Sequence, residues 1–154
     1  MAIVNARIKI GDGHIQDLEH DYGFLISDCD KIMTSPIRDY ETQQYPEKAG
    51  VKIDPRITLK EFDYKISFIY FSNNEYDANI AITKFYNSLF TPVNNSDIKI
   101  AKSIIIYNDY MGNVIQGYAK TLPPVGRFYR NRKDVVEFSF TIFVNDPNKC
   151  KWIN

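Results

Sequence analysis

Residues 62–71 read FDYKISFIYF, and this stretch decides the fold. Apolar and polar side chains alternate along it, so that one face is apolar and the other begins with three polar residues. The apolar face consists of Phe62, Tyr64, Ile66, Phe68 and Tyr70. A period of two predicts a β-strand with one face in the core. Because Ile69 and Phe71 are apolar as well, we expect the far end of this strand to be covered on both faces.

The segment that follows predicts a helix that would supply this cover. Asn73 or Asn74 is a suitable N-cap, and acidic residues then lie near the positive end of the helix dipole. Small and apolar residues recur at steps of three and four: Ala78, Ala81, Ile82, Phe85 and Leu89. We expect a helix over residues 75–90, ended by Thr91 and Pro92, because proline disfavours helical geometry in the residue before it.

The remaining pattern is that of strands. Alternation predicts strands over residues 4–10, 22–29 and 136–144, and a hairpin whose strands 102–107 and 114–120 flank a polar turn. In the last strand Phe138 and Phe140 are expected to point inward. Many strands with one helix predict a mainly β (α+β) domain, an antiparallel sandwich or split β-barrel with the helix packed across one opening. We expect a single domain over residues 1–154.

Composition excludes several classes of protein. The chain has 154 residues, of which 44% are apolar, and its 19 basic residues balance its 19 acidic ones. This content is too apolar for a disordered chain, and no apolar run is long enough to span a bilayer. Near the N-terminus Arg7 and Lys9 alternate with apolar residues as in a strand, unlike a secretory signal. We therefore expect a globular protein that is synthesised in the cytoplasm.

One long segment breaks the alternation. Residues 31–57 contain Pro36, Pro46, Gly50 and Pro55 among charged residues, which predicts a loop without long regular elements. Loops of this length are commonly binding or interface segments, or else disordered. This loop is therefore the first candidate for a functional segment.

The charges are distributed unevenly along the sequence. Residues 1–77 carry 9 basic and 14 acidic side chains, whereas residues 78–154 carry 10 basic and 5 acidic ones. The one basic cluster comprises Arg127, Arg130, Arg132 and Lys133. This cluster is either a solvated loop or one of two complementary surfaces in a head-to-tail contact.

No residue pattern carries a catalytic or metal-binding signature. The densest set of candidate ligands, between His14 and Asp21, lacks convincing metal-site spacing. Cys29 and Cys150 are expected as free thiols, because neither lies in a CxxC pair. No two carboxylates are singled out by their spacing as a hydrolytic pair. We therefore expect no enzyme activity, no metal and no cofactor.

Several segments, in this order, resemble the distal tail and tail-tube proteins of tailed bacteriophages and related tail-like machines. They are the loop at residues 45–51, the strand at 62–68, the helix at 75–90, the hairpin that ends at residues 117–119, and the strand at 136–144. The resemblance implies a split β-barrel with one helix, assembled without catalysis as a ring, commonly a hexamer, around the tail axis of a virion or tail-like particle. Many distal tail proteins carry a second, carbohydrate-module-like domain, and this chain resembles only the ring-forming part.

The expected function is therefore that of a structural subunit synthesised in the bacterial cytoplasm. Its expected partners are further copies of itself and other tail or baseplate proteins, with no membrane and no specific nucleic acid. The expected subunit interface combines the long loop with the basic segment and comprises Tyr45, Pro46, Glu47, Val51, Arg127, Arg130, Arg132 and Lys133. The alternative is a small-ligand or carbohydrate-binding β module that uses exposed tyrosine and phenylalanine rings. An enzyme with an unrecognised carboxylate site is a third possibility.

Overall fold

The computed structural model describes residues 5–30, 42–44, 51–53, 59–94, 97–109, 111–120, 126–128 and 131–152, without the side chains of residues 42–44, 51–53, 140 and 152. The elements in chain order are β1 (Arg7–Ile10), β2 (Gln16–Asp17), α1 (Leu18–Tyr22), β3 (Phe24–Cys29), β4 (Thr42–Gln44), β5 (Val51–Ile53), β6 (Phe62–Phe71), α2 (Glu75–Ser88), β7 (Phe90–Pro92), β8 (Lys99–Ala101), β9 (Ile104–Asn108), β10 (Asn113–Ala119), β11 (Arg127–Phe128), β12 (Val135–Val144), the short 3-10 helix η1 (Pro147–Lys149) and β13 (Lys151–Trp152).

One antiparallel sheet dominates the molecule. Its strands follow the order β2–β1–β9–β10–β12–β6–β3, with β11 paired to β12 and β13 paired to β10. The longest pairing joins β6 and β12 and runs from Val135 opposite Phe71 to Val144 opposite Phe62. The edge strands β2 and β3 are not paired with each other in this order. The mainly β prediction is therefore confirmed, and the sheet is not a closed barrel.

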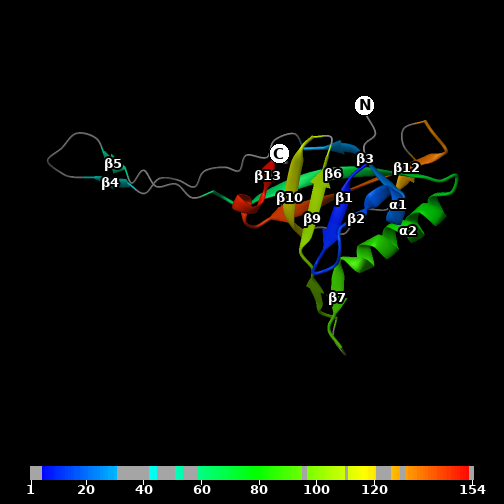
Figure 1. Ribbon diagram of the computed structural model, residues 1–154, viewed down its shortest axis with the longest axis horizontal. Coiled ribbons are helices and arrows are strands. Elements are labelled where there is room, and N and C mark those ends of the chain that lie inside the picture. Colours follow the sequence, from blue (N-terminus) through cyan, green and yellow to red (C-terminus); the bar gives the residue numbers. More distant parts are fainter. Residues whose placement is uncertain are drawn as a thin grey trace.

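β10 joins the two layers of this sheet. Its residues 113–117 pair with β9, whereas Tyr118 and Ala119 pair with β12. Figure 1 shows β1 and β9 crossing β6 and β12 steeply. One core cluster contains buried residues of both layers, among them Ile8 and Phe68. The sheet therefore folds over its own core as a two-layer sandwich.

Two short hairpins lie outside the main sheet. β4 pairs with β5 and β7 pairs with β8, each as a separate two-stranded antiparallel sheet. The first hairpin lies within the predicted loop at residues 31–57, and its three-residue strands agree with the expectation of no long regular element there. In Figure 1 both hairpins lie away from the sandwich.

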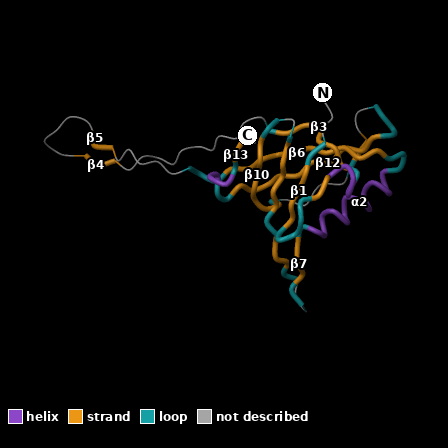
Figure 2. Tube along the Cα trace, in the orientation of Figure 1, coloured by secondary structure: helices purple, strands orange, loops and turns teal. Residues whose placement is uncertain are grey.

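α2 packs on the sheet face that carries the predicted apolar residues of β6. Its first turn is capped by Asn74, one of the two predicted caps, whose Oδ1 accepts a hydrogen bond from the backbone N–H of Tyr76 at 2.8 Å. The Phe85 ring lies 5.2 Å from that of Phe24, and Phe24 in turn lies 4.9 Å from Phe138. Figure 2 shows α2 running along one side of the strands.

The end of α2 differs from the prediction. The helix ends at Ser88, and Phe90–Pro92 form β7, so Pro92 lies in a short strand and does not merely stop a helix. The N–H of Leu89 still donates to Tyr86, but its carbonyl accepts a bond from Lys102 across to the next segment. This long-range bond, which the local sequence does not specify, draws the chain out of the helix.

The predicted cover at the end of β6 is half right. Ile69 is buried, whereas Phe71 is 54% exposed. Because Ile69 points to the face opposite Phe68, α2 is not what covers it: the helix packs on the face of Phe68. Apolar side chains on both faces of a strand therefore do not show that both faces are covered, or which element covers them.

The strand predicted over residues 22–29 begins at Phe24 in the structure, two residues later than predicted. Tyr22 ends the short helix α1, and β3 starts at Phe24. The Asp17 carboxylate caps α1 by accepting the N–H groups of Glu19 and His20, and Gly23 then adopts a φ of +77°. This left-handed backbone conformation is strained for residues other than glycine. Gly23 therefore ends the helix and allows the strand to begin.

The aromatic contacts predict a large cost for losing Phe138. Phe138 is 2% exposed and lies within 5.5 Å of the Phe68 ring. Phe138→Ala should lower the free energy of unfolding by about 3–5 kcal/mol through lost burial and an unfilled cavity. Phe71→Ala, in the same sheet but exposed, is the matched control and should cost far less. Urea unfolding of both variants measures the difference, and equal losses would contradict the assigned faces.

The crossing of the two layers predicts that Gly117 tolerates no side chain. A Cβ there would lie 2.2 Å from the Phe143 carbonyl oxygen. Gly117→Ala should therefore destabilise the fold by about 3 kcal/mol or more, because backbone must move. Gly112→Ala meets nothing within 4 Å but has a φ of +73°, and should cost only about 1 kcal/mol from backbone strain. Thermal unfolding compares the stabilities of the two variants. A larger loss for Gly112→Ala than for Gly117→Ala would contradict the close approach of β10 to β12 at Gly117.

Candidate functional site

The structure describes only part of the predicted interface. Tyr45, Pro46, Glu47 and Arg130 lie outside the described residues. Val51 opens β5, where it pairs with Gln44. The predicted contact between the long loop and the basic segment therefore stays a prediction.

The described part of the basic segment is compensated by nearby acids. The Arg127 guanidinium, in β11, lies 3.5 Å from the Glu75 carboxylate of α2. Arg132 donates two hydrogen bonds, of 3.0 and 2.8 Å, to Asp134. This fork lowers the pKa of Asp134 and raises the pKa of Arg132. Lys133 is exposed. Two of the four basic side chains in this segment, Arg127 and Arg132, therefore have an acidic partner within the chain.

Within the described residues, the acidic and the basic half of the sequence lie side by side. β6 from the acidic half pairs along its length with β12 from the basic half. Ion pairs also join the halves: Arg7 lies 2.7 Å from Asp109, and Lys120 lies 2.6 Å from Asp63. The described part of the antiparallel sheet thus mixes the charges of both halves, and the predicted contact between oppositely charged surfaces stays a prediction.

A different surface is exposed and apolar: one face of the hairpin of β7 and β8. Thr91 lies opposite Ile100 in the strand register, and the N–H of Val93 bonds to the carbonyl of Ile98 at 3.1 Å. Because side chains alternate, these four residues share one face. Val93 is 36%, Ile98 65% and Ile100 59% exposed. We call the four residues the β7–β8 face.

The hairpin is anchored to the core at its base. The Phe90 ring lies 4.9 Å from the ring of Tyr86 in the last turns of α2. The N–H of Lys102 donates a 2.9 Å bond to the carbonyl of Leu89, which is buried. The base of the hairpin is thus held while its apolar face meets solvent.

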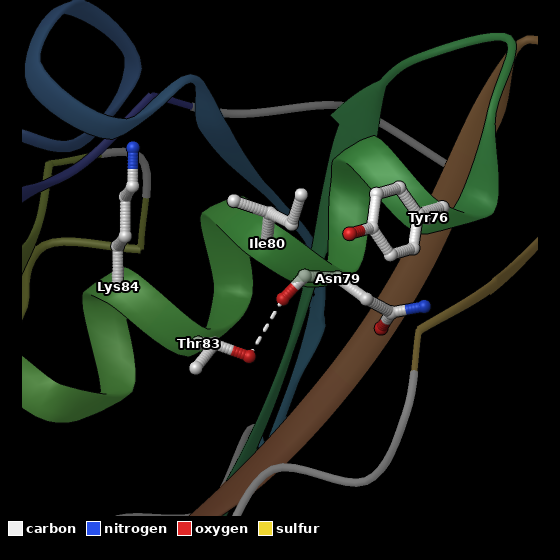
Figure 3. Close-up of a pocket in the computed structure, with 5 residues that line it drawn as sticks. All are labelled: Tyr76, Asn79, Ile80, Thr83 and Lys84. Carbon is white, nitrogen blue, oxygen red and sulfur yellow. Dashed lines mark hydrogen bonds between the residues drawn. The ribbon is translucent and has the colours of Figure 1, made fainter.

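The outer side of α2 carries a second surface, an open hollow of about 300 Å³. Figure 3 shows its side chains following one another along the helix. Tyr76 is 71% and Ile80 40% exposed. We call this surface the α2 stripe; it consists of Tyr76, Asn79, Ile80, Thr83 and Lys84.

Two polar side chains of the α2 stripe already have partners. The Asn79 Oδ1 accepts a 2.7 Å hydrogen bond from the N–H of Gly126, and its Nδ2 donates to the carbonyl of Glu75. The Thr83 hydroxyl donates a 2.7 Å bond to the Asn79 carbonyl (Figure 3). Tyr76 and Ile80 consequently dominate what the stripe offers to another molecule.

Sequence reasoning missed both surfaces, although each has a local signal. Residues 97–100 alternate between charged and apolar side chains, which is the pattern of a short exposed strand. Tyr76 and Ile80 are four residues apart on the side of the helix away from Ala78, Ile82 and Phe85. Neither pattern distinguishes a binding surface from ordinary exposure, so the structure was needed.

A cluster of polar side chains lies inside the sandwich. The side chain of Asn113 is fully buried, and Asn108 donates a 3.7 Å hydrogen bond to the Cys29 sulfur. The Tyr64 hydroxyl lies beside Cys29 and Asn113 but forms no hydrogen bond of good geometry with the described residues. Burial, with Cys29 next, raises the pKa of Tyr64. Polar side chains from β3, β6, β9 and β10 therefore meet inside the sandwich.

The residues between His14 and Asp21 build a helix terminus. Asp17 accepts hydrogen bonds from two backbone N–H groups of α1 and from the Asn5 side chain, which together lower its pKa. The His20 side chain is 87% exposed. Across the described ranges no group of three or more His, Cys, Asp or Glu side chains is placed to hold a metal ion.

Comparison with known proteins gives no family for this chain. Neither a protein-family model nor a curated protein matches it. In the part of the chain that the structure describes, no helix is long and apolar enough to cross a membrane.

The raised pKa of Tyr64 predicts that the free energy of unfolding falls at alkaline pH. Above about pH 10 a tyrosine ionises in the unfolded chain, whereas the buried Tyr64 stays protonated. Stability is therefore lost as the pH rises beyond that value. Tyr64→Phe should remove this part of the loss and change stability little at neutral pH, because the lost hydroxyl has no good hydrogen bond. Urea unfolding from pH 7 to 11 tests this; an unchanged alkaline loss would contradict it.

Proposed function

We propose that the chain is a non-enzymatic structural subunit of a phage tail or tail-like assembly, which associates head to tail into a ring around the tail axis. The observation that carries this proposal is the β7–β8 face. A lone two-stranded hairpin is marginally stable in water, and aliphatic side chains gathered on its exposed face are typical of a contact surface. A neighbouring subunit that covers the hairpin would bury these exposed aliphatic side chains.

The architecture supports the same proposal. The resemblance implies a split β-barrel with one helix, and the fold shares with it an antiparallel β-rich architecture and the long helix α2, although the sheet is not a closed barrel. The two hairpins outside the main sheet extend the chain beyond its own core, where they can reach neighbours. Each copy then offers unlike surfaces to its two neighbours, and a rotation that closes gives a ring.

Sedimentation velocity over a concentration series tests the proposal. We expect the sedimentation coefficient to rise with concentration toward one discrete species, because a closed ring has a fixed number of subunits. Electron micrographs of that species should show rings. A monomer at every concentration would contradict assembly by this chain alone, and an unlimited rise would favour open filaments.

The alternative is a small-ligand or carbohydrate-binding module, and Tyr76 is the observation in its favour. Tyr76 is 71% exposed and borders the hollow on α2, which Lys84 lines at its other end. Exposed aromatic rings can stack on the apolar faces of sugars. This function requires a saturable, Tyr76-dependent binding of a soluble glycan to a monomer, which a glycan array with wild type and Tyr76→Ala distinguishes from self-association.

A further inference from the structure

The polar cluster inside the sandwich contains three buried atoms that have no hydrogen-bond partner among the described residues. They are Oη of Tyr64 and both Oδ1 and Nδ2 of Asn113. Tyr64 is 2% and Asn113 0% exposed. A buried polar atom without a partner has lost its bonds to solvent and gained none in the fold, so it destabilises the native state. Three such atoms in one cluster therefore indicate a group that the cluster binds.

The strand pattern determines which way these side chains point. Asn113 begins β10, two residues before Ile115, and lies opposite Asn108 of β9. Because alternate residues of a strand share a face, Asn113 points into the sandwich together with the buried Ile115. Tyr64 enters from β6, which belongs to the other layer. The three unpartnered atoms therefore lie between the two layers.

The neighbouring side chains leave the Asn113 amide to a further group. Asn108 already has partners: its Oδ1 accepts a 3.1 Å bond from the N–H of Met111, and its Nδ2 donates to the sulfur of Cys29. Burial and then Cys29 raise the pKa of Tyr64, and the Asn113 side chain opposes them, so the hydroxyl lies beside both residues. Polar groups that face each other without a direct bond are those that a water molecule bridges.

We propose that an internal water molecule binds between the Asn113 amide and the Tyr64 hydroxyl and joins the two layers of the sandwich. This water accepts a bond from Nδ2 and donates one to Oδ1, while its second lone pair accepts the hydroxyl proton of Tyr64. Its other hydrogen is directed at the sulfur of Cys29. A buried water makes about three hydrogen bonds to groups that otherwise have none. The site belongs to the single chain, so it does not depend on the proposed assembly.

The pattern of donors and acceptors selects water over an ion. A metal cation could bind Oδ1 of Asn113 and Oη of Tyr64, but it would face the N–H groups of Nδ2, which only donate. An anion would accept from Nδ2 and from the hydroxyl, but it would face Oδ1, which only accepts. Water both donates and accepts, so one molecule satisfies all three atoms.

The bound water also favours the observed pairing of β9 with β10. Asn108 and Asn113 form the last pair of this hairpin before its turn. A slip of β10 by one residue would turn Asn113 to the other face and bring Val114 toward the site. The side chain of Val114 has no polar atom for the water, so the slipped pairing would lose the bridge between the layers.

NMR detection of contacts with water tests the site in the wild-type chain. The side-chain NH2 protons of Asn113 should show a dipolar cross-peak to water with the sign of a long-lived contact, because a buried water stays while the molecule rotates. The NH2 protons of Asn87, which is exposed on α2, are the matched control and should show only short-lived contacts. An Asn113 amide that contacts the Tyr64 hydroxyl and no long-lived water would overturn the proposal.

Tyr64→Phe separates bound water from exchange of the hydroxyl proton. The variant keeps both amide atoms of Asn113, so the cross-peak to water should remain. Its disappearance would mean that the signal had passed through the tyrosine hydroxyl, and the proposed site would be wrong.

Oxygen-17 relaxation dispersion counts the long-lived waters of each variant. Asn113→Leu removes both amide atoms with a side chain of similar shape and should lose about one long-lived water relative to wild type. Asn87→Leu makes the same exchange at an exposed position and should lose none. Melting curves show whether each variant is folded. An unchanged count in folded Asn113→Leu would overturn the proposal, and if that variant does not fold, the wild-type cross-peak decides.

Discussion

The cluster of phenylalanine rings around Phe24 holds the molecule together. Phe24 on β3 contacts Phe68 of β6, Phe138 of β12 and Phe85 of α2, so one side chain ties three strands to the helix. The register of β6 on β12, with Phe138 opposite Phe68, puts the rings on one face. A slip of one residue would turn them to the other face, so core burial and strand register enforce each other.

The surfaces available for binding follow from this packing. Because Ala78, Ile82 and Phe85 are buried in the core, the side of α2 that carries Tyr76 and Ile80 must face outward. Because Leu89 is buried at the end of the helix, the chain that leaves it begins the β7–β8 hairpin at the rim of the core. The core thus orients both surfaces without containing any of their residues.

Opposite charges from the two halves of the sequence pair with one another within the described part of the chain. Among the described residues, three ion pairs join the two halves of the sequence: Arg7–Asp109, Lys120–Asp63 and Arg127–Glu75. Exposed pairs of this kind add little stability. Their consequence is to leave less unbalanced charge for a partner, which shifts the weight of the assembly proposal to apolar contacts.

By itself the sequence determined the mainly β class, the strand at residues 62–71, the hairpin of β9 and β10, the last strand, and an asparagine cap of the long helix at residue 73 or 74. These depend on side chains two to four residues apart, so a local pattern contains them. Only the tertiary structure decided where β10 changes partner, that Gly23 divides α1 from β3, that Phe71 is exposed although Ile69 is buried, and how the acidic and basic halves pair. The two proposed binding surfaces belong to this second group, because exposure is defined by what the rest of the chain covers, and that depends on contacts between residues far apart in the sequence.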